Sequence, residues 1–105
     1  MRDFEKEIIL ALLSEAEQLE IKLPDSEKDI EIRHTGVGYY LEFQNESIPK
    51  KRIVLDKPVI SGYLGGVEVG FIAFIENSEF SLECYTFGEI ISPDCRNHEF
   101  IQTAT

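Results

Sequence analysis

The hydrophobic period of the chain changes at residue 29, and this change restricts the fold more than any other feature. Before it, residues 3–22 carry apolar side chains at spacings of three and four, which form one stripe on a helix (Phe4, Ile8, Leu12, Ala16 and Leu19). Asp3 is a candidate N-cap, and Glu5 and Glu7 fall in the first turn, where the helix dipole favours negative charge. Pro24 then prevents the helix from continuing.

From residue 29 onward apolar and polar residues alternate, as they do in half-buried strands. The alternation predicts strands over residues 29–35, 39–44, 52–56, 59–63, 67–76 and 80–87, followed by an irregular tail over residues 92–105. Because the pattern contains no second helix for a parallel crossover, we expect an antiparallel meander. The predicted fold is α+β, a single domain over residues 1–105, with the N-terminal amphipathic helix packed on one face of a five- to six-stranded, mostly antiparallel sheet.

The stretch RHTGVGYYLEF, residues 33–43, joins two of the predicted strands through glycines. A phosphate-binding glycine loop has more glycines and leads directly into a helix, whose N-terminus meets the phosphate. Here a strand follows and no lysine lies beside the glycines. The stretch therefore predicts a β-hairpin turn.

The charge balance bears on the kind of partner. The sequence has 20 acidic and 10 basic residues, with a formal net charge of −10. Such a surface repels phosphate backbones and anionic membranes, so we expect neither nucleic acid nor a membrane as partner. It attracts a basic protein and speeds the encounter with it, although an acidic surface also serves solubility alone.

The remaining global features indicate a cytoplasmic protein. The longest apolar stretch, residues 8–13, is too short to cross a bilayer, and acidic residues precede it where a signal peptide would have basic ones. The chain has two cysteines, whereas a small secreted domain normally carries several paired ones.

The residues capable of metal binding or nucleophilic chemistry are scattered. Cys95 and His98 are three residues apart, but His34 and Cys84 lie far from them and no C-x-x-C pair occurs, so we expect no metal and no cofactor. In the predicted alternation, Cys84 faces the helix as a small buried hydrophobe and His34 is half-buried and hydrogen-bonded to the turn. A Cys84–His34 pair beneath the helix would be out of reach of substrate. We therefore expect a binding protein and not an enzyme.

The sheet face opposite the helix is the predicted partner-binding surface. Tyrosine is a frequent interface anchor, because it combines a large contact area with a polar end, and carboxylates around it can pair with basic residues of a partner. The strand phase and these residue types select eight residues: Glu31, Arg33, Tyr40, Glu42, Tyr63, Glu83, Tyr85 and Phe87. The alternative is that the C-terminal tail covers Tyr85 and Phe87 and that the glutamates are merely solvated.

Three stretches carry a resemblance to a known group of proteins: RHTGVGYYLEF, VISGYLGGVEVGFIAFIEN and FSLECYTFGE. In this pattern the chain resembles small immunity proteins of bacterial polymorphic toxin systems, including those paired with contact-dependent growth-inhibition toxins. The resemblance implies a cytoplasmic protein that binds and neutralises the C-terminal toxin domain of a large effector. Such a toxin is often a basic nuclease, which would suit the charge of −10.

Two other classes of protein stay open from the residues alone. One is a regulatory domain that binds a small molecule or peptide between sheet and tail, in a pocket lined by Phe87, Tyr85 and His34. The other is an adapter subunit with a permanent partner, which a self-complementary apolar patch would indicate.

Overall fold

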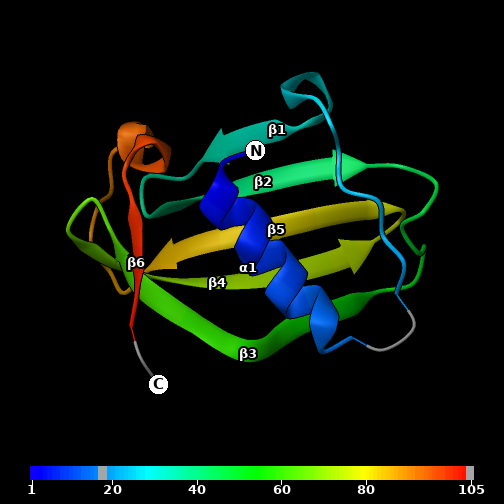
Figure 1. The fold of residues 1–105 in the computed structure, drawn as a ribbon. Coiled ribbons are helices and arrows are strands. Elements are labelled where there is room, and N and C mark those ends of the chain that lie inside the picture. The colour runs from blue at the N-terminus through cyan, green and yellow to red at the C-terminus, as the bar shows by residue number, and fades with distance from the viewer. Residues whose placement is uncertain (17–18, 104–105) are drawn as a thin grey trace.

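The computed structural model describes residues 1–16 and 19–103 and shows one helix packed on a curled, six-stranded antiparallel sheet (Figure 1). The fold is thus α+β, as the sequence predicts. Across the sheet the strand order is β1-β2-β5-β4-β3-β6, so the strands do not form a simple meander. The elements are α1 (Asp3–Ser14), η1 (Glu27–Asp29), β1 (Glu31–His34), β2 (Gly38–Gln44), β3 (Ile53–Leu64), β4 (Val67–Glu76), β5 (Glu79–Thr86), η2 (Pro93–Asn97) and β6 (Phe100–Gln102).

The helix is shorter than the predicted range of residues 3–22, of which residues 17–18 lie outside the described part of the chain. It begins at Asp3, with Arg2 in the N-cap position, and ends at Ser14. Beyond it the apolar side chains of the segment 19–23 recur at every second residue and pack against the core, as in an extended chain. Hydrogen bonds to the β2–β3 loop hold this segment, since the Lys22 amide donates to Ser47 Oγ over 2.9 Å. Leu19 therefore belongs to a period of two and not to the helical stripe.

The stretch between β1 and β2 is a hairpin turn, which confirms that prediction. The two strands pair in register from Glu31↔Glu42 to His34↔Tyr39. The two glycines have φ of +86° and +146°, and the Thr35 amide donates to the Gly38 carbonyl over 3.1 Å. Gly38 also lies against the β5 backbone, where a Cβ would overlap the Cys84 carbonyl.

Residues 52–56 and 59–63, predicted as two strands, form the single strand β3. Its register on β4 shifts between Leu55 and Ile60, so that the intervening residues bulge out of the ladder. Pro58 lies in this bulge. Proline lacks an N–H for the ladder but is tolerated at a bulge, and for this reason it does not end the strand here.

The tail, predicted to be irregular over residues 92–105, contains η2 and β6, while residues 104–105 lie outside the described part of the chain. Ser92 caps η2 by accepting the Asp94 amide over 3.1 Å. Strand β6 pairs with the end of β3, with Ile101 opposite Tyr63. Its Phe100 ring packs 5.8 Å from Phe4 and 5.3 Å from Phe71. Three residues are too few to display a period, and so the sequence pattern conceals this strand.

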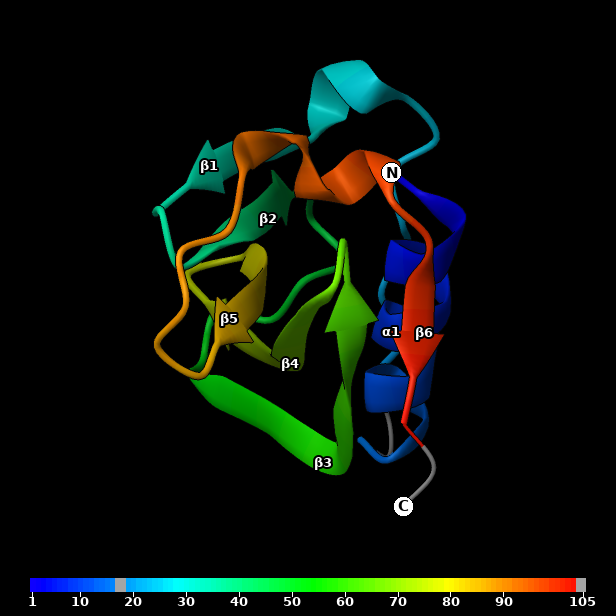
Figure 2. The same ribbon diagram turned by 90° about the vertical axis from the view of Figure 1, so that its left-hand side faces the viewer.

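The core lies between α1 and one face of the sheet, which we call the inner face. Ile8, Ile9 and Leu12 of the helix pack there against buried residues of the strands, such as Leu41 and Leu82. Seen from its end, the sheet curls around this core, with α1 and β6 along one side and η2 bridging the top (Figure 2). No helix of residues 1–16 and 19–103 covers the opposite, outer face (Figure 2). In residues 1–16 and 19–103, none of the helices has both the length and the apolar character that crossing a membrane requires.

Candidate functional site

The outer face brings several predicted partner-binding residues into one row across the sheet. The register places Arg33 of β1 opposite Tyr40 of β2, Tyr40 opposite Glu83 of β5, and Glu83 opposite Ile72 of β4. The Arg33 guanidinium carbon lies 4.4 Å from the centroid of the Tyr40 ring, which is a cation–π contact. Burial raises the pKa of the Tyr40 hydroxyl and the neighbouring Glu83 carboxylate raises it further, so the phenol stays protonated at neutral pH.

A second row begins with two predicted glutamates and continues into β5. Glu31 lies opposite Glu42, and Glu42 lies opposite Ser81. Glu42 is held in place, because its Oε1 lies 3.5 Å from Arg33 Nε and its Oε2 accepts the Ser81 hydroxyl over 3.1 Å. Glu31 is exposed on β1, at the edge of the sheet.

Tyr85 and Phe87 form an aromatic pair at the end of β5. Their rings are 5.6 Å apart in an edge-to-face arrangement. Tyr85 covers Gly70 of β4, where a Cβ would lie 2.5 Å from the tyrosine hydroxyl oxygen. Phe87 is 61% exposed, so the tail does not cover it. The chain after β5 instead runs along the end of the β1–β2 hairpin towards η2 (Figure 2).

Tyr63 lies apart from the other predicted residues. It is on β3, opposite Glu68. Three strand spacings, or about 14 Å measured across the sheet, separate β3 from β2, the strand that carries Tyr40. Any partner that contacts both tyrosines must therefore span most of the sheet.

The outer face is strongly acidic. Its outward positions on β1, β2, β4 and β5 carry a single basic residue, Arg33, and six acidic ones: Glu31, Glu42, Glu68, Glu76, Glu79 and Glu83. Arg33 is already paired with Glu42. The charge that this face presents to an approaching molecule is therefore negative.

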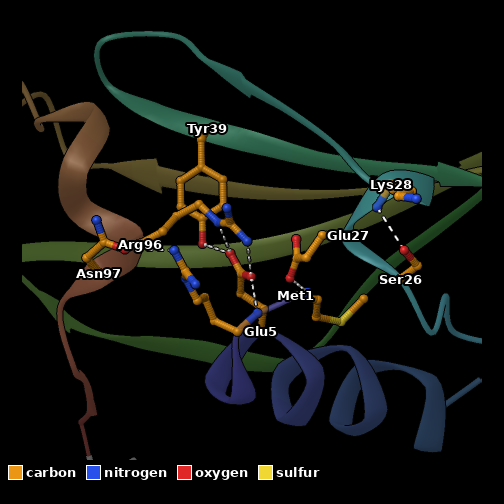
Figure 3. A network of polar contacts seen from close by, with 9 residues as sticks. Met1, Glu5, Ser26, Glu27, Lys28, Tyr39, Arg96 and Asn97 are labelled. Carbon is orange, nitrogen blue, oxygen red and sulfur yellow. Dashed lines mark hydrogen bonds and ion pairs between the residues drawn. The ribbon is translucent and has the colours of Figure 1, made fainter.

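A buried polar cluster, not predicted from the sequence, is formed by α1, β2 and η2 (Figure 3). The carboxylate of Glu5 is fully buried and accepts hydrogen bonds from Tyr39 Oη over 2.6 Å, from Arg96 Nε and Nη2 over 2.7 Å each, and from the Arg2 amide over 2.8 Å. Burial alone raises the pKa of Glu5, but these hydrogen bonds outweigh it and hold the pKa below its ordinary value. With four donors on its two oxygens, the carboxylate has no free acceptor for substrate chemistry, and its role is structural.

One signal in the sequence points to half of this cluster. Glu5 lies four and seven residues before Ile9 and Leu12, and therefore on the apolar side of the helix, where a charged residue needs a partner. The partner, Arg96, lies in a tail without periodicity. Only the tertiary structure brings it to Glu5.

The histidines and cysteines do not assemble into a reactive site. Cys84 and Cys95 are both buried, and burial raises the pKa of each thiol, which keeps it protonated and unreactive. His34 was expected to be half-buried, but its side chain is exposed at the end of β1, the outermost strand of the sheet. Among residues 1–16 and 19–103, no three His, Cys, Asp or Glu side chains lie close enough together to hold a metal ion.

Within the described part of the chain, the side chains that the regulatory-domain alternative places in one pocket lie on different faces of the sheet. His34 shares the inner-face phase of its partner Tyr39, whereas Tyr85 lies on the outer face beside Gly70. A ligand cannot contact both from one side of the sheet. A hollow of about 480 Å³ lies elsewhere, between the start of α1 and the segment from Arg96 to Phe100.

Comparisons of the chain with protein-family models, with curated proteins and with solved structures found no match. These comparisons therefore assign the chain to no family.

Proposed function

We propose that the chain is a binding protein that neutralises a basic toxin domain, and that the outer face of its sheet is the surface that binds it. The observation that carries the proposal is the composition of this face: six glutamates and one paired arginine share it with Tyr40, Tyr85 and Phe87. Aromatic side chains bordered by carboxylates suit a partner whose surface is rich in lysine and arginine.

The proposed mechanism has an electrostatic step and an anchoring step. The negative potential of the face attracts the basic partner and speeds encounter. Glu31 and Glu83 then pair with basic side chains of the toxin, and Tyr40 and Tyr85 supply the desolvated contacts. If those basic side chains grip the toxin's own anionic substrate, their pairing with glutamate also blocks its activity.

The proposal draws its class from the resemblance to immunity proteins of polymorphic toxin systems. In such a system the protein acts in the cytoplasm, without catalysis, metal or cofactor, and its partner is the C-terminal toxin domain of a large effector. Neither nucleic acid nor membrane is a partner, because the acidic face repels both.

The proposal predicts that a gene directly upstream encodes a large secreted effector, and the test is a binding titration with the C-terminal domain of that effector. We expect tight association that weakens as salt is raised. The double variant Glu42→Lys/Glu83→Lys should associate at least tenfold more slowly and depend less on salt. The absence of such an effector gene, or an effector domain that does not bind, would contradict the proposal.

A matched control separates the face from the total charge. The double variant Glu7→Lys/Glu46→Lys makes the same change in net charge at exposed positions on the helix and in the β2–β3 loop. It should associate within threefold of the unchanged chain, because steering depends mainly on charges near the contact. Equal losses in both double variants would mean that the outer face has no special role.

A further inference from the structure

One end of the sheet carries most of the large apolar side chains that the described residues expose. Eight such residues are exposed, and five of them lie along this end. Val37, Phe87 and Ile90 lie together at the β1–β2 turn and the end of β5, and Tyr63 and Ile101 lie across the sheet from them on β3 and β6. We call these five residues the apolar rim. Ile90 is 84% exposed, the highest value among the eight.

Hydrogen bonds on both sides hold the part of the rim that follows β5. The Thr86 amide donates to the Val37 carbonyl over 3.0 Å, and the Ile91 amide donates to the Gly36 carbonyl over 2.9 Å. Within the turn, Thr86 Oγ1 donates to the Glu89 carbonyl over 2.6 Å, and Gly88 has φ of +101°. The chain could turn Ile90 inward only by breaking these bonds, so the fold itself keeps Phe87 and Ile90 exposed.

The surroundings of the rim are acidic. Residues 58–95 contain no lysine, arginine or histidine. Of their acidic residues, Glu68, Glu83 and Glu89 lie towards this end of the sheet, whereas Glu76 and Glu79 lie at the opposite end. Glu89 lies between Phe87 and Ile90 in the turn, and Glu68 lies opposite Tyr63. A second copy of this chain would bring like charges together at the rim, and an anionic lipid surface would be repelled as well.

We infer that the rim inserts into an apolar hollow on a cationic protein, with Phe87 and Ile90 as the inserted side chains and the flanking glutamates paired to basic residues around the hollow. This inference rests on the proposed function and specifies its partner. The toxin domain has an apolar depression bordered by lysine and arginine, in addition to the basic surface that faces Tyr40 and Glu83. Exposed aromatic and aliphatic side chains on a rigid turn bind with little loss of conformational entropy.

The test uses a cationic amphipathic helical peptide of leucine and lysine as probe, with the 15N-labelled chain observed by NMR. We expect shifts of the amide signals of residues 36–38 and 86–91, and at least tenfold weaker binding by Phe87→Ser/Ile90→Ser. Ile90→Ser alone, at a position that leaves the Tyr85–Phe87 contact intact, should weaken binding about threefold.

The matched control is Val54→Ser/Val59→Ser, which removes two exposed apolar side chains from β3. It should bind the peptide within twofold of the unchanged chain. The inference is overturned if both double variants lose affinity equally, if the shifts avoid the rim, or if neutral phosphatidylcholine vesicles displace the peptide from the rim.

The peptide titration and the effector titration can fail separately. Shifts confined to the surroundings of Glu42 and Glu83 would refute the rim and leave the proposed function standing. Rim binding of the peptide, together with an effector domain that does not bind, would refute the proposed function. When the effector does bind, Ile90→Ser should raise its dissociation rate, whereas Glu42→Lys/Glu83→Lys should lower its association rate.

Discussion

Arg96 of η2 holds Glu5 of α1 in a two-pronged ion pair, across a sequence separation of 91 residues. The Glu5 side chain is fully buried and that of Arg96 is 13% exposed, so the pair is shielded from solvent and salt. It ties the C-terminal segment to the first turn of the helix, with Tyr39 of β2 as the third member. The cluster thus joins both ends of the chain to the sheet.

Removal of Arg96 should destabilise the protein strongly. Arg96→Ala leaves a buried carboxylate without its charged partner, and we expect a loss of about 3 to 5 kcal/mol in the free energy of unfolding. Urea denaturation followed by circular dichroism measures it. The control is Arg2→Ala, which removes an exposed hydrogen bond to Asn97 and should cost less than about 1 kcal/mol. Similar losses of unfolding free energy in both variants would mean that the buried ion pair stabilises the protein no more than the exposed hydrogen bond does.

Replacement of both partners should recover much of that stability. In Glu5→Leu/Arg96→Leu no charge stays buried, although the Tyr39 hydroxyl loses its acceptor. We expect the double variant to be more stable than Arg96→Ala alone. A double variant that is less stable than either single variant would show that the ion pair adds net stability, beyond offsetting the cost of burying its two charges.

Stability should depend on the protonation of Glu5 at acid pH. Its pKa in the folded protein is held below the ordinary value of 4.5, so the stabilisation from Glu5 is complete above about pH 4.5 and is lost as the pH falls through the folded pKa. The difference in unfolding free energy between the unchanged chain and Glu5→Gln should therefore shrink below pH 4.5. Urea titrations from pH 6 to pH 3 test this, with exposed Glu7→Gln as control. Curves for the unchanged chain and Glu5→Gln that stay parallel throughout would contradict it.

The contact between Gly70 and Tyr85 should be visible in a double-mutant cycle. Gly70→Ala places a methyl group against the phenol ring and should cost about 1 to 3 kcal/mol, because the ring must move away. In a Tyr85→Ala background the same change should cost less than about 1 kcal/mol, since the methyl group then has room. Thermal or urea unfolding of the four proteins gives the coupling energy. A cost that does not depend on residue 85 would refute the contact.

The two thiols should resist alkylation in the folded protein. Cys84 and Cys95 are each 1% exposed, and burial raises the pKa of both, so the reactive thiolate is scarce at neutral pH. Iodoacetamide should label them at least a hundredfold more slowly than in denaturing urea. Mass spectrometry follows the reaction at each site, and fast native labelling of either cysteine would show that its segment opens.

The sequence reveals the hairpin and the outward phase of Tyr40, because alternation and glycine placement are local properties of the backbone. The helix predicted from the sequence is too long, because Leu19 fits both a helical and an extended period of apolar residues. The sequence pattern divides β3 at Pro58, since a bulge depends on the neighbouring strand. His34 was wrongly expected to be half-buried. The alternation predicts which face of the strand a side chain lies on, but it does not predict whether another segment covers that side chain.

By itself, then, the sequence determined the fold class, the acidity of the chain and the outward-facing side of β1, β2 and β5, because each follows from composition or from the short period of the backbone. Only the tertiary structure decided the strand order, the pairing of Glu5 with Arg96 and the gathering of Phe87, Ile90 and Val37 at one end. These features join residues far apart in the chain, and their geometry is set by how the helix, sheet and tail close around one core.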